Sequence, residues 1–446
     1  MRTNKYLNLK NFSFILLSVL IVITGCKKKD ISDEIVNPVD NLTPLCFTAG
    51  GDGAKIYMDV HGELSTIPKF EYSYDRKTWY AYIPDTTVVT LENYGDKVYF
   101  RGDNPNGLSL NTVSYVSFRI KNITVEASGN VMSLIDTTCR LKTIPSKYCF
   151  SRLFAGTRIT TAPDLPTTTL TDYCYYCMFG GCELLRNAPK LPAKTLAPYC
   201  YYHMFAGSGV HSVPELPATH LAEHCYDYMF SSCRSINVAP SLPATKLAPY
   251  CYSSMFDWCL NLMIAPKLPA TTLEEGCYMN MFGTCVNLSK APDLPATNLA
   301  DYCYQYMFSA CISLAKAPEL PATKLAIGCY RNMFNDCTAL TQAPELPATV
   351  LAKHCYAGMF KTCAQLTKAP ELPATELVYC CYYEMFYECF QLKSIKVHFT
   401  KWLDSDSTTC RWVYDLLHKG TFYCPASLPQ EFGLSRIPEG WTVETF

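Results

Sequence analysis

The sequence predicts an α+β repeat solenoid with units of about 26 residues, preceded by a small β-sandwich-like domain. The main observation is a motif, Cys-Tyr-x-x-Met-Phe, that occurs nine times. Its first cysteines are 26 residues apart in seven of the eight intervals and 25 apart in the other. A constant period over more than 200 residues is typical of stacked units, none of which can bury its apolar side alone.

Each unit divides into two halves, and the first is predicted to be a helical turn. On a helix that advances about 100° per residue, Cys251, Tyr252, Met255, Phe256 and Cys259 fall within one arc of about 140°. The polar residues between them fall outside this arc, as an amphipathic helix requires. The second half, Leu-x-x-Ala-Pro-x-Leu-Pro-Ala, predicts a strand of only about three or four residues, because proline donates no hydrogen bond to a sheet.

Two different segments flank the repeats, which span residues 138–397. Residues 42–137 form the predicted β-sandwich-like domain, with strands over 88–91, 97–101 and 113–120. Residues 398–446 are predicted to cap the last unit, through a helix ending at Leu417 and a strand over 421–424. In this helix 404–407 would form the N-terminal cap of 408–417.

The first 41 residues predict secretion and attachment to a membrane. Basic residues precede a short apolar run over 14–23, as in a signal peptide over 1–25. The following Ile-Thr-Gly-Cys26 resembles the lipobox of bacterial lipoproteins, in which the cysteine is lipidated. Residues 26–41 resemble the charged tether of Bacteroides-type surface lipoproteins, which implies display at the outer membrane. The alternative is an ordinary secretory signal with an incidental cysteine.

The repeat itself resembles a known family. The pattern Phe-x-x-Cys-x-x-Leu, followed by an extended segment and proline, is similar to the BspA-like leucine-rich repeats of bacterial surface proteins over about residues 140–397. A period of 26 lies within the range of about 20 to 29 residues for leucine-rich repeats. The resemblance implies surface display and, for some members, adhesion to host or matrix proteins. In this chain Ala-Pro replaces the usual strand isoleucine.

Composition and motifs argue against several other classes of function. The net charge of −1 offers no basic face for nucleic acid. We find no catalytic motif and expect neither an enzyme nor a cofactor. Cys174-x-x-Cys177 and the histidines before Cys225 have zinc-like spacings but lack the remaining ligands, so we predict no metal site. The repeated cysteines are expected to form buried columns of mostly reduced thiols.

The leading functional hypothesis is a surface lipoprotein that binds or adheres to protein ligands. Charged residues recur beside Ala-Pro in successive repeats, and stacking would turn them into a basic and an acidic stripe. The alternatives are ordinary solvated rows, a glycan-capture protein that binds through the N-terminal β-domain, and a structural spacer. The candidate ligand face consists of Lys290, Asp293, Lys316, Glu319, Glu345, Lys368 and Glu371.

Overall fold

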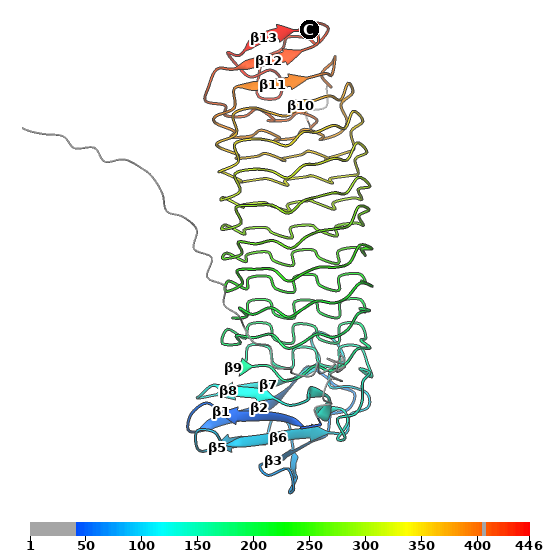
Figure 1. The fold of residues 1–446 in the computed structure, drawn as a ribbon, viewed down its shortest axis with the longest axis vertical. Coiled ribbons are helices and arrows are strands. Elements are labelled where there is room, and N and C mark those ends of the chain that lie inside the picture. The colour runs from blue at the N-terminus through cyan, green and yellow to red at the C-terminus, as the bar shows by residue number, and fades with distance from the viewer. Residues whose placement is uncertain (1–41, 404–406) are drawn as a thin grey trace, which may run out of the picture. The chain divides into compact units, whose positions relative to one another are not determined.

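The first half of each repeat is a ladder of tight turns, so the predicted α+β class is wrong. In the computed structural model, which describes residues 42–403 and 407–446, the one helical element is the 3-10 turn η1 (Val131–Leu134). The other regular elements of the described residues are β-strands. From β9 (Ile159–Thr161) toward the C-terminus the repeats stack as successive coils along one axis (Figure 1).

Two kinds of backbone hydrogen bond alternate along the turn ladder. We number the positions of a repeat from its first motif cysteine, which is position 0. In the repeat of Cys251, the amide of Ser253 donates to the carbonyl of Tyr250 (3.1 Å), which closes a β-turn. The next amide, that of Ser254, donates to the carbonyl of Met279 in the following coil (2.8 Å). Every second amide therefore ties one coil to the next.

The turns place every fourth residue in the left-handed backbone region. Tyr250, Ser254 and Trp258 have φ angles of 54°, 48° and 59°, and the same positions, −1, +3 and +7, have positive φ in neighbouring coils. This conformation costs an L-residue about 1–2 kcal/mol, so a coil depends on its neighbours for stability. The helical wheel was misleading because positions 0, +1, +4, +5 and +8 face the core in both an amphipathic helix and a ladder that repeats every four residues.

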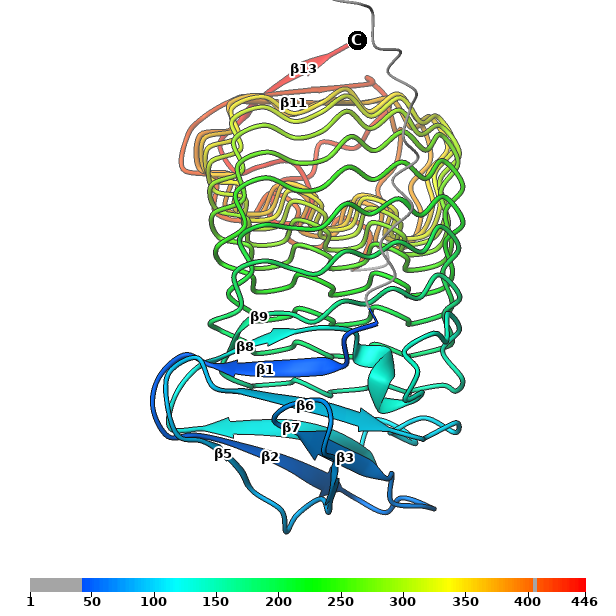
Figure 2. The ribbon, with the colours of Figure 1, turned by 60° about the horizontal axis from the view of Figure 1, so that its bottom comes forward.

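The motif side chains form continuous columns in the interior. Phe256 stacks between Phe230 and Phe282, with ring centroids 5.8 and 6.0 Å away. The tyrosines at position +1 form a second column, in which neighbouring centroids are 5.7 to 6.1 Å apart. Figure 2, which looks toward one end of the stack, shows successive coils following nearly the same path. Each buried ring is thus packed mainly by its own equivalents in the coils on either side.

Cysteine supplies two further columns, and all 24 described cysteines are free thiols. At position +8 the thiol donates to a phenylalanine carbonyl of the preceding coil, as Cys259 does to Phe230 (3.1 Å). In the two repeats that are one residue short, Thr157 and Ser208 take this position and are buried. Each of these hydroxyls lies 3.5 Å from the position +8 thiol of the next coil. The column therefore accepts any small side chain that can form hydrogen bonds.

The second half of each repeat is extended but forms less strand than predicted. Several neighbouring coils meet there through single parallel bridges, such as the one between Lys316 and Gln342. The prolines limit the ladder because they have no amide hydrogen. Longer pairing begins near the C-terminus, where β10 (Glu371–Leu372) pairs in parallel with β11 (Ser394–Val397).

The N-terminal domain contains two sheets. The segments predicted as strands over 88–91, 97–101 and 113–120 coincide with β5, β6 and β7 to within two residues. One sheet has the order β4-β3-β6-β1-β8-β9 and the other has the order β5-β2-β7. The strands are β1 (Leu45–Ala49), β2 (Ala54–His61), β3 (Phe70–Ser73), β4 (Tyr80–Tyr82), β5 (Val89–Leu91), β6 (Lys97–Gly102), β7 (Tyr115–Lys121) and β8 (Val125–Ser128).

Aromatic packing joins these sheets to the first coil. Phe47 of β1 lies edge-on to Phe118 of β7, with centroids 4.9 Å apart. Phe118 in turn stacks on Phe154 of the first coil at 5.5 Å. Because β8 also pairs in parallel with β9, both backbone and core continue from the domain into the repeats.

At the C-terminal end the predicted helix over 408–417 is wrong. Arg411 and Asp415 have φ angles of 50° and 57°, which places them in the same left-handed positions as in the repeats. The amide of Phe386 donates to the carbonyl of Trp412 (2.8 Å), as between two ordinary coils. This segment therefore continues the turn ladder for one more coil.

The strand predicted over 421–424 is confirmed as β12 (Thr421–Cys424), which pairs with β13 (Thr442–Thr445). Trp412 is fully buried, and its ring lies 6.3 Å from that of Phe386 at the end of the phenylalanine column. A large ring at the phenylalanine position of this coil thus covers the last phenylalanine of the column.

The predicted signal peptide, the lipidation site Cys26 and the tether over 26–41 lie outside the described residues, as do residues 404–406. Within the described part of the chain, no helix has the length and apolar character needed to cross a membrane.

Candidate ligand-binding surfaces

The predicted ligand face is solvent-exposed on the extended side of the coils. The lysines occupy position +13, where a bridge joins Lys316 to Gln342 of the next coil. The acidic residues occupy position +16. Glu371 pairs with Lys396 (2.9 Å) and His398 (2.6 Å), whereas the other six form no ion pair with any described residue. All seven are exposed: Lys290, Asp293, Lys316, Glu319, Glu345, Lys368 and Glu371.

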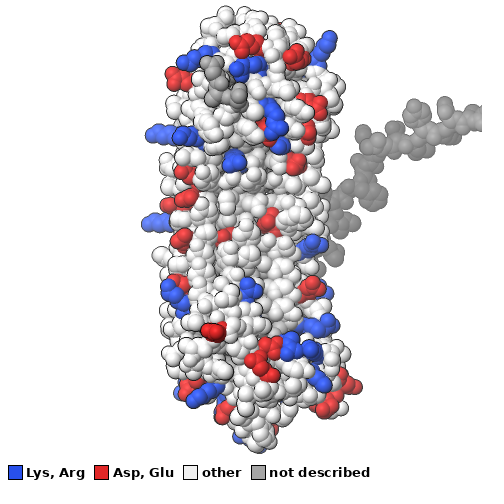
Figure 3. All heavy atoms as spheres, turned by 180° about the vertical axis from the view of Figure 1, so that it is seen from behind, with Lys and Arg blue, Asp and Glu red and all other residues white. Residues whose placement is uncertain are grey.

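The two rows are not joined by ion pairs. Asp293, Glu319 and Glu345 are 26 residues apart and occupy equivalent points of successive coils, so that like charges follow one another. Figure 3 shows acidic side chains at several heights along the left edge of a mostly uncharged surface, with basic side chains between some of them. Adjacent like charges repel each other, which makes such a row a poor source of stability.

On the turn side, positions −1, +2, +3, +6 and +7 face outward, and we call this surface the turn face. Its N-terminal half carries a column of stacked rings at position −1, with successive centroids 4.4 to 4.7 Å apart. We call these rings the aromatic column. Its members are Tyr148, Tyr173, Tyr199, His224 and Tyr250.

The aromatic column presents ring edges to solvent, since the ring faces are covered by their neighbours. At its C-terminal end the ring of Tyr250 lies over Gly276, where a β-carbon would overlap it. Gly276 also has a φ of 53°, so this position favours glycine for two reasons. A sugar ring that packs on an aromatic side chain needs a free face, and this column offers none between its members.

One histidine–aspartate pair belongs to this region. His224 takes the place of a tyrosine in the aromatic column, and its Nδ1 lies 2.7 Å from Oδ2 of Asp227. Burial raises the pKa of Asp227, although the hydrogen bond to His224 opposes that shift. Among the described residues, no group of three or more His, Cys, Asp or Glu side chains is arranged to hold a metal ion. We assign this pair to the packing of the column.

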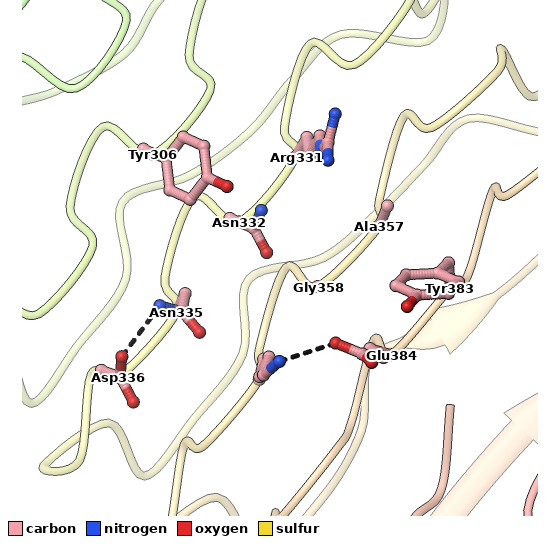
Figure 4. Close-up of a pocket in the computed structure, with 10 residues that line it drawn as sticks. Tyr306, Arg331, Asn332, Asn335, Asp336, Ala357, Gly358, Tyr383 and Glu384 are labelled. Carbon is pink, nitrogen blue, oxygen red and sulfur yellow. Dashed lines mark hydrogen bonds and ion pairs between the residues drawn. The ribbon is translucent and has the colours of Figure 1, made fainter. Parts of the chain in front are cut away.

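The C-terminal half of the turn face contains a polar hollow of about 400 Å³ (Figure 4). It exists because the coil of Cys355 carries Ala357 and Gly358 at positions +2 and +3, where other coils carry larger side chains. Figure 4 shows Tyr306 and Tyr383 on opposite sides of the hollow. The remaining lining side chains are Arg331, Asn332, Asn335, Asp336, Lys361 and Glu384.

The carboxylate of Glu384 is already neutralised by two cations. Lys361 Nζ lies 2.6 Å from Oε2, and the guanidinium of Arg411 pairs with Oε1. Burial opposes ionisation of Glu384, but the hydrogen bond from Lys361 and the charge of Arg411 outweigh it and lower the pKa. This acidic group is therefore occupied and does not compete for a cation from solvent.

Arg331 is different, because its guanidinium forms no ion pair or side-chain hydrogen bond with a described residue. It is half-buried at position +2, at the edge of the hollow. Nearby His354 has a lowered pKa, first because it is partly buried and then because of the positive charges of Arg331 and Lys353. Lys353 is exposed and has no ion-pair partner among the described residues. The potential on this side of the hollow is positive.

In the N-terminal domain two aromatic rings are covered by cations, whereas Tyr74, Tyr80 and Tyr94 are exposed. The guanidinium of Arg101 covers the ring of Trp79 at 3.9 Å, and that of Arg119 covers Tyr57 at 4.2 Å. Asp75 accepts the amides of Lys77 and Thr78 at 2.8 Å each, and these backbone hydrogen bonds lower its pKa to about 2. Asp75 thus shapes the β3–β4 hairpin.

The comparisons do not assign the chain to a family: no family model, no curated protein and no solved structure matches it.

The sequence predicted the exposed charged rows but missed the hollow and the aromatic column. Both lie at positions that a helical wheel treats as unremarkable surface. A signal was present, since Ala357-Gly358 stands where neighbouring repeats have Arg331-Asn332 and Tyr383-Glu384. Two small residues in place of two large ones predict a depression only once the coils are known to stack in register.

Proposed function

We propose that this chain is a lipid-anchored cell-surface protein whose repeat coils bind a protein ligand through the exposed charged rows. The observation that carries the proposal is the row of Asp293, Glu319 and Glu345, whose charges are exposed, stacked and without ion-pair partners among the described residues. A basic protein surface would relieve their mutual repulsion. The lysines at position +13 add a second row that can discriminate between partners by charge.

The charged rows can be tested by reversing one of them. In the triple variant Asp293→Lys, Glu319→Lys and Glu345→Lys, we expect the melting temperature to stay within a few degrees, because the three side chains are exposed. Binding to an array of immobilised matrix proteins and glycans should fall, mainly through the association rate and more strongly at low salt. A folded triple variant that binds a wild-type partner equally well would exclude this face.

A separate experiment tests the proposed lipidation of Cys26 and the display of the protein at the cell surface. Labelled palmitate should enter the wild-type protein but not Cys26→Ser, because a lipobox cysteine is the acylated residue. Protease added to intact cells should remove the wild-type protein from the surface. Protection until the outer membrane is broken would contradict surface display, and labelling of Cys26→Ser would contradict the assigned site.

A further inference from the structure

The hollow on the turn face has the size of a small-ligand site. Its volume of about 400 Å³ falls in the range of about 300–1,000 Å³ that is usual for such pockets. It arises from two missing side chains, at Ala357 and Gly358, while the backbone of the ladder continues unchanged through this coil. Its walls are therefore preformed.

The charges around the hollow favour an anion. Glu384 is paired with Lys361 and Arg411, which leaves Arg331 as the cation without a partner among the described residues. Asp336 is the second lining carboxylate; it accepts a hydrogen bond from Asn335 (2.9 Å) but forms no ion pair with a described residue. Once Arg411 is counted, the cations around the hollow still exceed the carboxylates by one. A guanidinium binds a carboxylate with two parallel hydrogen bonds, a geometry that ammonium cannot reproduce.

The other lining side chains without hydrogen-bond partners among the described residues are suited to bind hydroxyl groups of a ligand. The side-chain amide of Asn332 and the hydroxyl of Tyr306 form no hydrogen bond with a described residue, and both line the hollow. An amide can donate and accept at once, as can a phenol. A ligand that carried only a carboxylate would leave these groups without partners.

The two tyrosines at the hollow differ from those of the aromatic column. Neither Tyr306 nor Tyr383 stacks on another aromatic ring of the described residues, and Figure 4 shows them on opposite sides of the space. The hydroxyl of Tyr383 is held by Arg411 at 3.3 Å. Both tyrosines are half-buried. An aromatic ring beside polar groups can pack against a pyranose ring, which has apolar C–H faces and a polar edge.

We propose that this hollow binds one hexuronate residue of an acidic polysaccharide. In this arrangement Arg331 holds the sugar carboxylate, Asn332 and Tyr306 meet the ring hydroxyls, and a tyrosine face packs against the ring. An acidic peptide could also offer backbone amide and carbonyl groups to Asn332 and Tyr306, but it lacks the apolar ring face that a tyrosine would pack against, so it is the less complete match. The site is separate from the charged rows proposed for a protein ligand, which lie on the extended side of the coils.

Two variants test the site. Arg331→Gln removes the charge and should fold, since Gln305 occupies the same position one coil earlier in the stack. Gly358→Asn fills the hollow, because a β-carbon there overlaps the side chain of Asn332. Asparagine tolerates the φ of 61° and already stands at this position in Asn280 and Asn332. The matched control is Lys324→Asn, an exposed cation elsewhere whose equivalent one coil earlier is Asn298.

Binding would be measured by calorimetry with a galacturonate trisaccharide, a glucuronate trisaccharide, neutral galactotriose and hexaglutamate. The wild-type chain and Lys324→Asn should bind at least one uronate and neither galactotriose nor hexaglutamate. Arg331→Gln should weaken uronate binding at least tenfold, and Gly358→Asn should abolish it. Failure of both uronates to bind, uronate binding within twofold of wild type in Arg331→Gln, or equal binding of hexaglutamate would overturn the proposal.

Discussion

Replacing Phe308 by alanine is expected to destabilise the surrounding coils by about 3–5 kcal/mol. Phe308 is fully buried and stacks between Phe282 and Phe334, with both centroids 5.7 Å away. The substitution interrupts a column whose rings are packed mainly by one another, and the rigid ladder around it cannot close the cavity. Hydrogen exchange of the backbone amides should show faster opening of the coils on either side, together with a lower melting temperature.

Gln305→Ala is the matched control in the same coil. Gln305 is half-buried at position +2, on the outward side of the ladder, and no side-chain hydrogen bond to another described residue is lost with it. Its exchange rates and melting temperature should stay close to those of the wild type. Equal effects of the two substitutions would mean that the phenylalanine column is not what holds the coils together.

The thiols are expected to be almost unreactive in the folded chain and fully reactive after unfolding. In a Cys26→Ser chain, Ellman's reagent at pH 8 should titrate about two thiols, because only Cys177 and Cys410 are half-buried among the 24 described cysteines. Burial raises the pKa of many of the buried thiols, to about 12 in Cys303 and Cys311, so their reactive thiolate form is scarce at this pH.

In denaturant without reductant, all 24 thiols of that chain should react. Fewer than about eight would mean that disulfides join the columns, which contradicts the free thiols of the structure. The double variant Cys177→Ser and Cys410→Ser provides the control in the native state, since its remaining reactivity should be close to zero. Rapid reaction of many thiols in the native double variant would mean that the coils open readily.

The period and the core positions could be predicted from the sequence, but the backbone conformation could not. Cys251, Tyr252, Met255, Phe256 and Cys259 are all buried, as the wheel predicted. Over nine residues, however, a period of about 3.6 and a period of four select the same inward positions. An α-helix and the turn ladder differ in the backbone φ of every fourth residue. Tyrosine and serine stand at several of these left-handed positions, and neither side chain indicates a positive φ.

A weaker signal for the turn ladder was present in the glycines and asparagines. Gly276 and Gly328 precede a motif cysteine, Gly358 and Asn332 stand at position +3, and Gly181 stands at position +7. These are the three positions with positive φ, where glycine and asparagine are favoured. Aligned by repeat, they form three columns four residues apart, which an α-helix does not explain.

The hollow could not be predicted because it depends on side chains from four coils. Tyr306, Asn332, Gly358 and Glu384 are each 26 residues apart, so their proximity follows only from the register of the stack. The exposed charged rows were easier to predict, since each lies at one repeated position. The sequence could not predict whether the two described rows form ion pairs with each other. That depends on the distance between positions +13 and +16 in the folded coil.

The hydrogen bonds that join successive coils also determine how the stack responds to mechanical load. They point along its axis, so a pull between its ends acts on one row of bonds after another. Detaching a single coil releases 26 residues, or about 90 Å of chain at about 3.5 Å per residue. The stack would therefore lengthen in steps, coil by coil, and dissipate work at each step before the whole molecule failed. A stack built in this way would lower the peak force that a sudden pull transmits between its two ends.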